Sequence, residues 1–547
     1  MIDEHAVDEL SIETKIGQLL HIGIGLGHFE TDTGWPAEEM ADVVDELRPG
    51  AVRIYGTHRA GPYAMAEYTN CLQELADGTD HAIPLLLSAD CEYGTVDIVG
   101  HGTQAYPSLM GRTATGDPDL AREVSAAIAR DACSMGLSLT HRPVADVHTN
   151  PDNPVIGVRS PGTDPATVSQ YATAALEGIH DVGGIGVAKH FPGHGDTELD
   201  SHHELPHVTD DRETIERVHL PPFEVLIEEG IDCIMTSHVV VDAIDPDRPA
   251  TLSKPVLTGL LREDLGFEGV VVTDAMMMDA VAENYGVGEA AVRAVAAGAD
   301  LVLTGYVPHE DLRETRDALL AAVEGGDLPE SRIDRSVERI LALKERAGAT
   351  DRRRVDPVEA LEVTGRETHR SLAREAYERS VTLLADDGLP IGGNDAVLLT
   401  GVRGVGALEP HFDRAFGPVV TCSLAPDGTR TSANSKPATE PTTDALQTVR
   451  TLAADVDRAV VTTYSREAFP ESQRRLVENV AEEASTTVVS LGLPNEFSEL
   501  SGVGYLGTYL QDRLGLPDPV PDAASQAIVG TLREPPAVRE SLPIGDR

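Results

Sequence analysis

One pattern, a short apolar strand followed by a loop and an amphipathic helix, recurs eight times between about residue 10 and residue 345. The predicted strands are 18–25, 51–56, 84–90, 137–147, 185–190, 233–238, 269–274 and 300–304. Eight such alternations favour a closed (β/α)8 barrel, with a doubly wound open sheet as the structural competitor. Because periodicity alone does not separate the two folds, the positions of the polar residues must decide between them.

Polar side chains stand where several of these strands end. Ionisable or imidazole groups close five strands, namely Asp90, Asp146, Lys189 with His190, His238 and Asp274. In a (β/α)8 barrel the carboxyl ends of the strands carry the chemistry. Five such ends exceed what stability requires, so we predict an N-terminal TIM (β/α)8 barrel that forms a catalytic domain over residues 1–348.

A second α/β region follows the barrel. Residues 350–363 are rich in Arg, Asp and Glu and contain a proline, which is typical of a linker, and we place the linker at 349–370. A helix is predicted from about Arg366 to Ser380, and residues 371–547 form the second domain. Its predicted strands are 381–385, 396–400, 419–423, 459–464 and 486–491, and the polar segment 425–443 is predicted to be an exposed loop.

The densest set of reactive side chains lies in the segment Lys189-His-Phe-Pro-Gly-His-Gly-Asp-Thr-Glu-Leu-Asp-Ser-His202, directly after a strand. Pro192 and the neighbouring glycines prevent an immediate helix, so we predict a long loop over the barrel mouth. In an extended chain residues i and i+2 point the same way. The Asp200 carboxylate can then hold one ring nitrogen of His202 and leave the other to move a proton, although an Asx turn is the alternative.

Asp274 ends the apolar run Gly269-Val-Val-Val-Thr-Asp and is predicted to emerge at the barrel mouth. A carboxylate there can attack an anomeric carbon and form a covalent glycosyl-enzyme. An N-cap for the next helix is the competing interpretation of an aspartate at this position.

Several ordered motifs together resemble glycoside hydrolase family 3. They are the loop from Lys189 to His202, the segment Asn153-Pro-Val-Ile-Gly-Val-Arg-Ser160 and the strand end Val-Thr-Asp274-Ala-Met. The form Lys-His-Phe-Pro-Gly-His-Gly…Asp-Ser-His resembles the β-N-acetylglucosaminidase (β-N-acetylhexosaminidase) branch of that family. The resemblance runs nearly end to end and implies that the second domain is an α/β sandwich.

The resemblance also implies roles for individual residues and a substrate. Asp274 would be the nucleophile of a retaining enzyme that removes terminal β-linked N-acetylglucosamine, and His202, oriented by Asp200, would be its acid/base. The sugar would be held by Lys189, His190 and Arg159, with Asp90 binding hydroxyls on the far side of the ring. Charged groups grip saccharides through charge-assisted hydrogen bonds, which agrees with these assignments.

The sequence departs from the family pattern after Asp90. Related enzymes continue with Gln-Glu-Gly-Gly and an arginine-bearing segment, whereas this chain has Cys91-Glu-Tyr-Gly-Thr95 and no arginine before Arg112. The far end of the sugar is therefore expected to be recognised differently. A β-glucosidase or β-xylosidase of the same family is an alternative. A glycoside phosphorylase is another, since a neutral histidine does not repel phosphate as a carboxylate would.

Two readings from other classes remain. His190, His194, His202, His203, His238 and Asp274 suit zinc, so a metal-dependent TIM-barrel hydrolase is a remote alternative. The first strand region offers only His21 and His28 toward such a site, and we expect no metal. A non-catalytic sugar-binding protein would have lost the nucleophile or the acid/base, and both are intact. Gly183-Gly-Ile-Gly186 enters a strand rather than a helix, so no cofactor is expected.

The net charge bears on which classes of partner the protein can bind and on the environment in which it works. The formal charge is −48, acidic residues are spread throughout, and only five of the 43 basic residues are lysines. Such a surface repels itself and needs screening, which is typical of halophiles, so we predict an origin in an extreme halophile. The charge argues against nucleic acids and anionic membranes as partners. Met1 to His5 show no export signal, so a cytoplasmic location is expected. Oligomeric state is not indicated.

Overall fold

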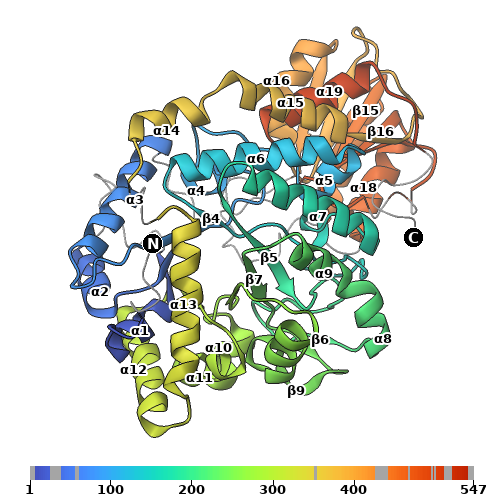
Figure 1. The fold of residues 1–547 in the computed structure, drawn as a ribbon. Coiled ribbons are helices and arrows are strands. Elements are labelled where there is room, and N and C mark those ends of the chain that lie inside the picture. The colour runs from blue at the N-terminus through green and yellow to red at the C-terminus, as the bar shows by residue number, and fades with distance from the viewer. Residues whose placement is uncertain are drawn as a thin grey trace. The chain divides into compact units, whose positions relative to one another are not determined.

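The structure is a computed structural model that describes residues 7–24, 38–55, 61–349, 354–424, 441–465, 469–494, 497, 500–510 and 520–539 (Figure 1). The chain forms two compact units. The first comprises Met1–Gln104, Ala121–Val147 and Pro165–His369, and the second comprises Ala105–Leu120, His148–Asp164 and Arg370–Arg547. Two short segments from the first half of the chain thus belong to the second unit. The predicted boundaries at 348 and 370 stay a prediction.

The first unit is built on an eight-stranded parallel sheet in the order β10-β7-β5-β4-β3-β2-β1-β11. A parallel bridge between Val272 and Leu301 joins its two ends, which confirms the barrel prediction. The strands are β1 Leu20–Ile24, β2 Ala51–Ile54, β3 Leu86–Ala89, β4 Leu139–Thr140, β5 Ile185–Phe191, β7 Cys233–Thr236, β10 Val270–Val272 and β11 Val302–Gly305. Every residue of these strands is buried, as expected for a parallel sheet covered on both faces.

Helices follow the barrel strands and pack on one another, with α11 against α12, α1 against α13 and α7 against α9 (Figure 1). Ser11 begins α1, since its hydroxyl accepts a hydrogen bond from the Thr14 amide at 3.3 Å. The helices are α1 Ile12–Leu19, α2 Glu38–Leu47, α3 Gly61–Asp77, α4 Val96–Val99, α6 Pro118–Ser134, α7 Pro165–His180, α8 Arg212–Thr214, α9 Pro221–Glu228, α10 Asp279–Tyr285, α11 Val287–Ala297, α12 His309–Gly325, α13 Glu330–Arg346 and α14 Pro357–Thr364.

The second unit contains a six-stranded sheet in the order β12-β17-β16-β15-β13-β14, in which only β12 and β17 pair antiparallel. Leu398 and Leu399 of β13 face two different apolar cores, one completed by α16 and α19 and the other by α17 and α18. This layering confirms the α/β sandwich. Its elements are β12 Thr382–Ala385, β13 Val397–Gly401, β14 Val419–Ser423, β15 Arg458–Thr463, β16 Ser485–Ser490, β17 Gly504–Gly507, α5 Leu109–Ala114, α15 Glu367–Ser380, α16 Val405–Ala415, α17 Thr443–Ala453, α18 Glu471–Ala481 and α19 Asp522–Arg533.

The structure differs from the expected elements in a few places. The strand predicted at 137–147 is reduced to β4 and one further bridge, Val144 to Lys189, because the chain turns through Pro143. Part of the predicted linker is the helix α14. A small sheet of β6 His207–Val208, β8 Val240–Val241 and β9 Asp245–Pro249 was not expected. The predicted loop over 425–440, residues 350–353 of the linker and the first six residues lie outside the described residues.

Across the described residues, no helix is long and apolar enough to cross a membrane.

The packing of α13 onto α1 buries the side chain of Lys344 completely. Its ammonium donates one hydrogen bond, to Oε1 of Gln18 at 2.6 Å. Burial lowers the pKa of Lys344 to about 7. Because the unfolded chain holds this proton up to about pH 10.4, the lysine opposes folding at neutral pH.

Replacing Lys344 by methionine is expected to raise the free energy of unfolding at pH 7 by about 2–4 kcal/mol, after allowing for the lost bond to Gln18. The gain should shrink as pH rises from 7 toward 10, since the unfolded lysine then also loses its proton. Denaturant unfolding at pH 7 and pH 9.5 measures it. Lys15→Met is the matched control. Lys15 pairs with Glu330 at 3.0 Å and Asp334 at 2.7 Å, so its replacement should lower the free energy of unfolding. An equal effect of Lys344→Met at both pH values would contradict the account.

Candidate active site

The carboxyl ends of neighbouring barrel strands bring together most of the residues singled out in the sequence. Asp90 follows β3, Lys189 and His190 lie on β5, His238 follows β7 and Asp274 follows β10. These strands are adjacent in the sheet except that β4 separates β3 from β5. The side chains therefore stand at one mouth of the barrel, where the chemistry of this fold is found.

Asp90 is held between two cations. Nζ of Lys189 donates to its Oδ1 at 3.0 Å, and Arg53 of β2 forms an ion pair with its Oδ2. Nζ of Lys189 also contacts Oε1 of Glu92 at 2.7 Å. Burial raises the pKa of Asp90, but Arg53 and Lys189 outweigh it and hold that pKa well below its ordinary value. The carboxylate is thus a fixed, ionised acceptor.

Asp146 organises the start of the loop after β5. Its fully buried carboxylate accepts from Nδ1 of His190 at 2.8 Å and from the amide of His194 at 2.7 Å. Burial raises its pKa, and His190 outweighs that so that the pKa of Asp146 is lowered. Because an ionised carboxylate only accepts, Nδ1 of His190 carries the proton.

Asp200 and His202 form the pair that the i, i+2 spacing predicted. Nδ1 of His202 donates to Oδ1 of Asp200 at 2.7 Å, and the same oxygen accepts from the His202 amide at 2.9 Å. Burial raises the pKa of Asp200, but the hydrogen bonds and charge of His202, together with the charge of His203, outweigh it and lower that pKa to about 2. The imidazole is about half exposed. Its Nε2 is therefore the atom that can pass a proton.

Asp274 sits among imidazoles. Burial raises its pKa, while His190, His238 and His202 lower it, and the net pKa lies far below the ordinary value. The amide of Ala275 donates to its Oδ1 at 2.7 Å. The carboxylate is ionised at any physiological pH, as a nucleophile must be. The N-cap alternative is not what the structure has, because α10 begins at Asp279 and its N-cap residue is Met278.

His238 braces the turn that carries Asp274. Its Nε2 donates to the carbonyl of Ala275 at 3.0 Å, and its Nδ1 lies 2.8 Å from Oγ1 of Thr251. The hydroxyls of Thr251 and Thr236 lie 2.7 Å apart. The Thr236 hydroxyl in turn accepts a hydrogen bond from the Asp274 amide at 3.4 Å. Burial lowers the pKa of His238. His238 is thus a hydrogen-bonded core residue that fixes the turn, which the sequence left undecided.

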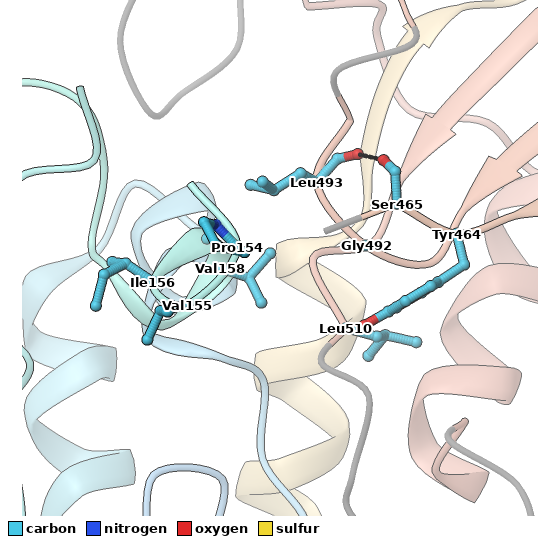
Figure 2. Close-up of a pocket in the computed structure, with 10 residues that line it drawn as sticks. Pro154, Val155, Ile156, Val158, Tyr464, Ser465, Gly492, Leu493 and Leu510 are labelled. Atoms are coloured by element: carbon cyan, nitrogen blue, oxygen red, sulfur yellow. Dashed lines mark hydrogen bonds between the residues drawn. The ribbon is translucent and has the colours of Figure 1, made fainter. Parts of the chain in front are cut away.

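Arg159 belongs to the second unit rather than to the barrel. It ends the short 3-10 turn Gly157–Arg159, and its Nη1 donates to the carbonyl of Val155 at 3.2 Å. The same segment lines a small pocket within the second unit (Figure 2). The lining residues are Pro154, Val155, Ile156, Gly157, Val158, Tyr464, Ser465, Gly492, Leu493 and Leu510. A role for Arg159 in holding the sugar stays a prediction.

Sequence reasoning missed three residues at the barrel mouth. Arg53 and Glu92 contact the Asp90–Lys189 pair, and Asp146 anchors His190. Asp146 had been noted only as a strand end. The signal for Arg53 was an arginine inside an otherwise apolar, buried strand, Ala51–Ile54, because a buried charge requires a partner.

The metal-dependent alternative has no matching geometry in the described part of the chain, which contains no group of three or more His, Cys, Asp or Glu side chains placed to bind a metal ion. His194 uses its two nitrogens on Thr197 at 2.8 Å and Ser201 at 2.9 Å. Both nitrogens of His238 are also hydrogen-bonded. These rings act as supports in the structure.

Comparison with known proteins agrees with this geometry. The chain is 30% identical over 384 residues to beta-hexosaminidase A of Pseudoalteromonas piscicida, covering 66% of this chain and 63% of that protein. It is 33% identical over 346 residues to beta-hexosaminidase LpqI of Mycobacterium tuberculosis, covering 61% and 83%. A solved glycoside hydrolase family 3 beta-N-acetylglucosaminidase from Paenibacillus superposes with a TM-score of 0.83 at 32% identity, covering 98% of each chain.

The family model for the glycosyl hydrolase family 3 N terminal domain matches residues 11–343, which contain β1 to β11 and the loop with Asp200 and His202. That match exceeds half of the 547 residues. It includes every strand of the barrel and the carboxylates and imidazoles at its mouth. This chain belongs to glycosyl hydrolase family 3.

Proposed function

We propose that this protein is a retaining β-N-acetylhexosaminidase that removes terminal β-linked N-acetylglucosamine, with Asp274 as nucleophile and His202 and Asp200 as the acid/base pair. The observation that carries the proposal is the 2.7 Å bond from Nδ1 of His202 to Asp200 on the loop after β5. That bond supports His202 as an imidazole acid/base. The same imidazole helps to lower the pKa of Asp274. The names of the relatives point to the same activity.

The chemistry follows from the protonation states. In the first half, Asp274 attacks the anomeric carbon while the His202 imidazolium gives its Nε2 proton to the leaving oxygen. The C–O bond breaks and a glycosyl ester forms on Asp274. Neutral His202, with Nδ1–H still donated to Asp200, then takes a proton from water as that water attacks the anomeric carbon and the bond from that carbon to Asp274 breaks. The free sugar leaves, and Asp274 and His202 return to their starting forms.

Binding of the sugar is assigned to groups that include both an anionic hydrogen-bond acceptor and a cationic donor. Asp90 is an ionised acceptor and Lys189 a charged donor 3.0 Å from it, so a hydroxyl placed between them can donate to one and accept from the other. His190 is assigned to the same set, and the bond from its Nδ1 to Asp146 fixes the orientation of the ring. Arg159 is proposed to complete this set.

Replacing His202 by alanine is expected to lower kcat/KM for 4-nitrophenyl β-N-acetylglucosaminide by about 100-fold or more, because the leaving oxygen then lacks its proton. The loss should be larger for glycosides with more basic leaving groups. His203→Ala is the matched control on the same loop, since the His203 side chain lies 3.9 Å from Asp279 and its bond to Asp200 comes from the backbone amide, which alanine keeps. Steady-state assays in concentrated KCl measure both.

Substrate choice is tested in the same assay. Preference for the N-acetylglucosaminide over the corresponding glucoside supports the proposal. Preference for glucose with a silent His202→Ala variant would keep the family and overturn both the substrate and the acid/base. Product analysis in phosphate buffer separates hydrolysis from phosphorolysis, because only phosphorolysis yields the sugar 1-phosphate.

The proposed setting is the salt-rich cytoplasm of a halophile. The support is the net charge of −48 and the scarcity of lysine, five of 547 residues. Of these, Lys15, Lys189 and Lys344 are buried in ion pairs or hydrogen bonds. Lysine therefore remains largely where a specific contact uses it.

A further inference from the structure

Arg53 is an unusual residue for the place it occupies. It lies in the middle of β2, Ala51–Ile54, where every residue is buried, and only 8% of it is exposed. A guanidinium in a barrel wall costs stability unless its charge and its N–H groups find partners. Apolar residues occupy the other three positions of β2, so fold stability alone does not account for an arginine here.

The charge of Arg53 is committed to Asp90. Arg53 contacts Oδ2 while Lys189 occupies Oδ1 at 3.0 Å, so each carboxylate oxygen faces one cation. The guanidinium also stacks on the ring of Tyr55, with 4.2 Å from Cζ to the ring centre. Burial lowers the pKa of Arg53, but Asp90 outweighs it and Asp274 adds to the same effect. Arg53 thus stands within the electrostatic reach of both site carboxylates.

Two donors of this group have no described partner. Nε of Arg53 and the hydroxyl of Tyr55 are both inaccessible to solvent, and no described residue bonds to them. Burial raises the pKa of Tyr55, Arg53 lowers it, and Asp90 and Asp274 raise it further. Buried donors without partners are uncommon in proteins, so this pair requires an explanation beyond the packing of β2.

We propose that Arg53, supported by Tyr55, is a substrate-binding residue that determines specificity at the end of the sugar ring remote from the scissile bond. In a pyranose attacked at C1 by Asp274, the remote substituents are those on C4 and C6. Asp90 accepts from a remote hydroxyl, and the guanidinium of Arg53, which is 8% exposed and stacked on Tyr55, donates to that hydroxyl. No lysine or arginine lies between Asp90 and Arg112. Arg53 of β2 instead supplies a cation at this end of the site. This inference rests on the proposed function.

The test compares selectivity at two ends of the sugar in Arg53→Lys and Arg53→Leu. The 4-nitrophenyl β-glycosides of N-acetylglucosamine and N-acetylgalactosamine differ only at C4, and those of N-acetylglucosamine and glucose differ only at C2. Loss of a charge-assisted contact is expected to lower kcat/KM for the N-acetylglucosaminide about tenfold in Arg53→Lys and about 100-fold in Arg53→Leu. The C4 preference should fall by a similar factor, while the C2 preference stays unchanged.

Arg262→Lys is the matched control for structural damage. Arg262 is also a largely buried arginine of the barrel and pairs with the buried carboxylate of Asp300 at 2.6 Å, but Asp300 precedes β11 at the opposite end of the strands. The Arg262→Lys variant should leave both the C4 and the C2 preference unchanged. If Arg53→Leu does not fold, Arg53→Lys decides, because it keeps the charge and most of the volume.

Three outcomes separate the ideas. A fall in the C4 preference alone supports the inference. Unchanged C4 preference in Arg53→Lys, or equal loss at C4 and C2, overturns it. A wild-type enzyme that prefers glucose at C2 overturns the proposed function, while the C4 comparison, repeated with glucosides and galactosides, still tests Arg53.

Discussion

Replacing Asp274 by alanine is expected to lower kcat/KM for 4-nitrophenyl β-N-acetylglucosaminide by about ten-thousandfold or more, because the carboxylate that forms the glycosyl ester is then lost. The ionised state of Asp274 is built into its surroundings. Three imidazoles outweigh the effect of burial on its pKa, and the Ala275 amide bonds to its Oδ1 at 2.7 Å. Alanine removes the nucleophile and leaves the hydrogen bonds of the His238 brace, so the fold should persist.

Chemical rescue makes this prediction specific. Azide added to Asp274→Ala should restore turnover of an activated substrate and produce the α-glycosyl azide, since a small anion can attack from the face that the carboxylate used. Asp279→Ala is the control, because that residue starts α10 five positions later and is half exposed. It should retain most activity. Residual activity in Asp274→Ala above about 1% of wild type, without azide, would argue against a nucleophilic role.

Lowering KCl from about 3 M to about 0.1 M is expected to reduce the unfolding midpoint by more than about 10 °C and to remove activity. The physical reason is the formal charge of −48, which arises from 91 acidic and 43 basic residues. At molar salt the Debye length is about 3 Å, and at 0.1 M it is about 10 Å, so repulsion between neighbouring carboxylates returns. Thermal unfolding followed by circular dichroism measures the shift.

A screening effect must be separated from general stabilisation by cosolutes. Sucrose favours burial of surface without screening charge, so it should recover little of the stability lost at low salt. Salts of different cations at equal ionic strength should protect to similar degrees. A midpoint independent of KCl, or full protection by sucrose, would contradict the interpretation of the charge as adaptation to a salty cell.

Most of the fold was accessible from local patterns. Each of the eight predicted barrel strands contains an observed strand, because a strand buried on both faces is a continuous apolar run with a clear end. The exceptions have local causes. β4 is only Leu139–Thr140, since the run at 137–147 is interrupted by Pro143. β17, Gly504–Gly507, has glycine at both ends and too few apolar residues to be recognised.

The site was predictable where its contacts are local. The Asp200–His202 bond follows from i, i+2 geometry within one loop. The Arg53–Asp90 and His190–Asp146 pairs join residues 37 and 44 positions apart, and only the pairing of neighbouring strands, β2 with β3 and β4 with β5, brings them together. Membership of Arg159 in the second unit is likewise a tertiary property that no motif carries.

The most direct test of the account is to trap the glycosyl-enzyme. An N-acetylglucosaminyl fluoride with a second fluorine at C5 slows both oxocarbenium-like transition states, while its leaving group still departs. Mass spectrometry of the digested protein should then show one fluorinated N-acetylglucosamine unit on the peptide that contains Asp274. The adduct should be absent from Asp274→Ala and present in Asp279→Ala. Turnover of the reagent with no adduct, or an adduct on another residue, would contradict Asp274 as the nucleophile.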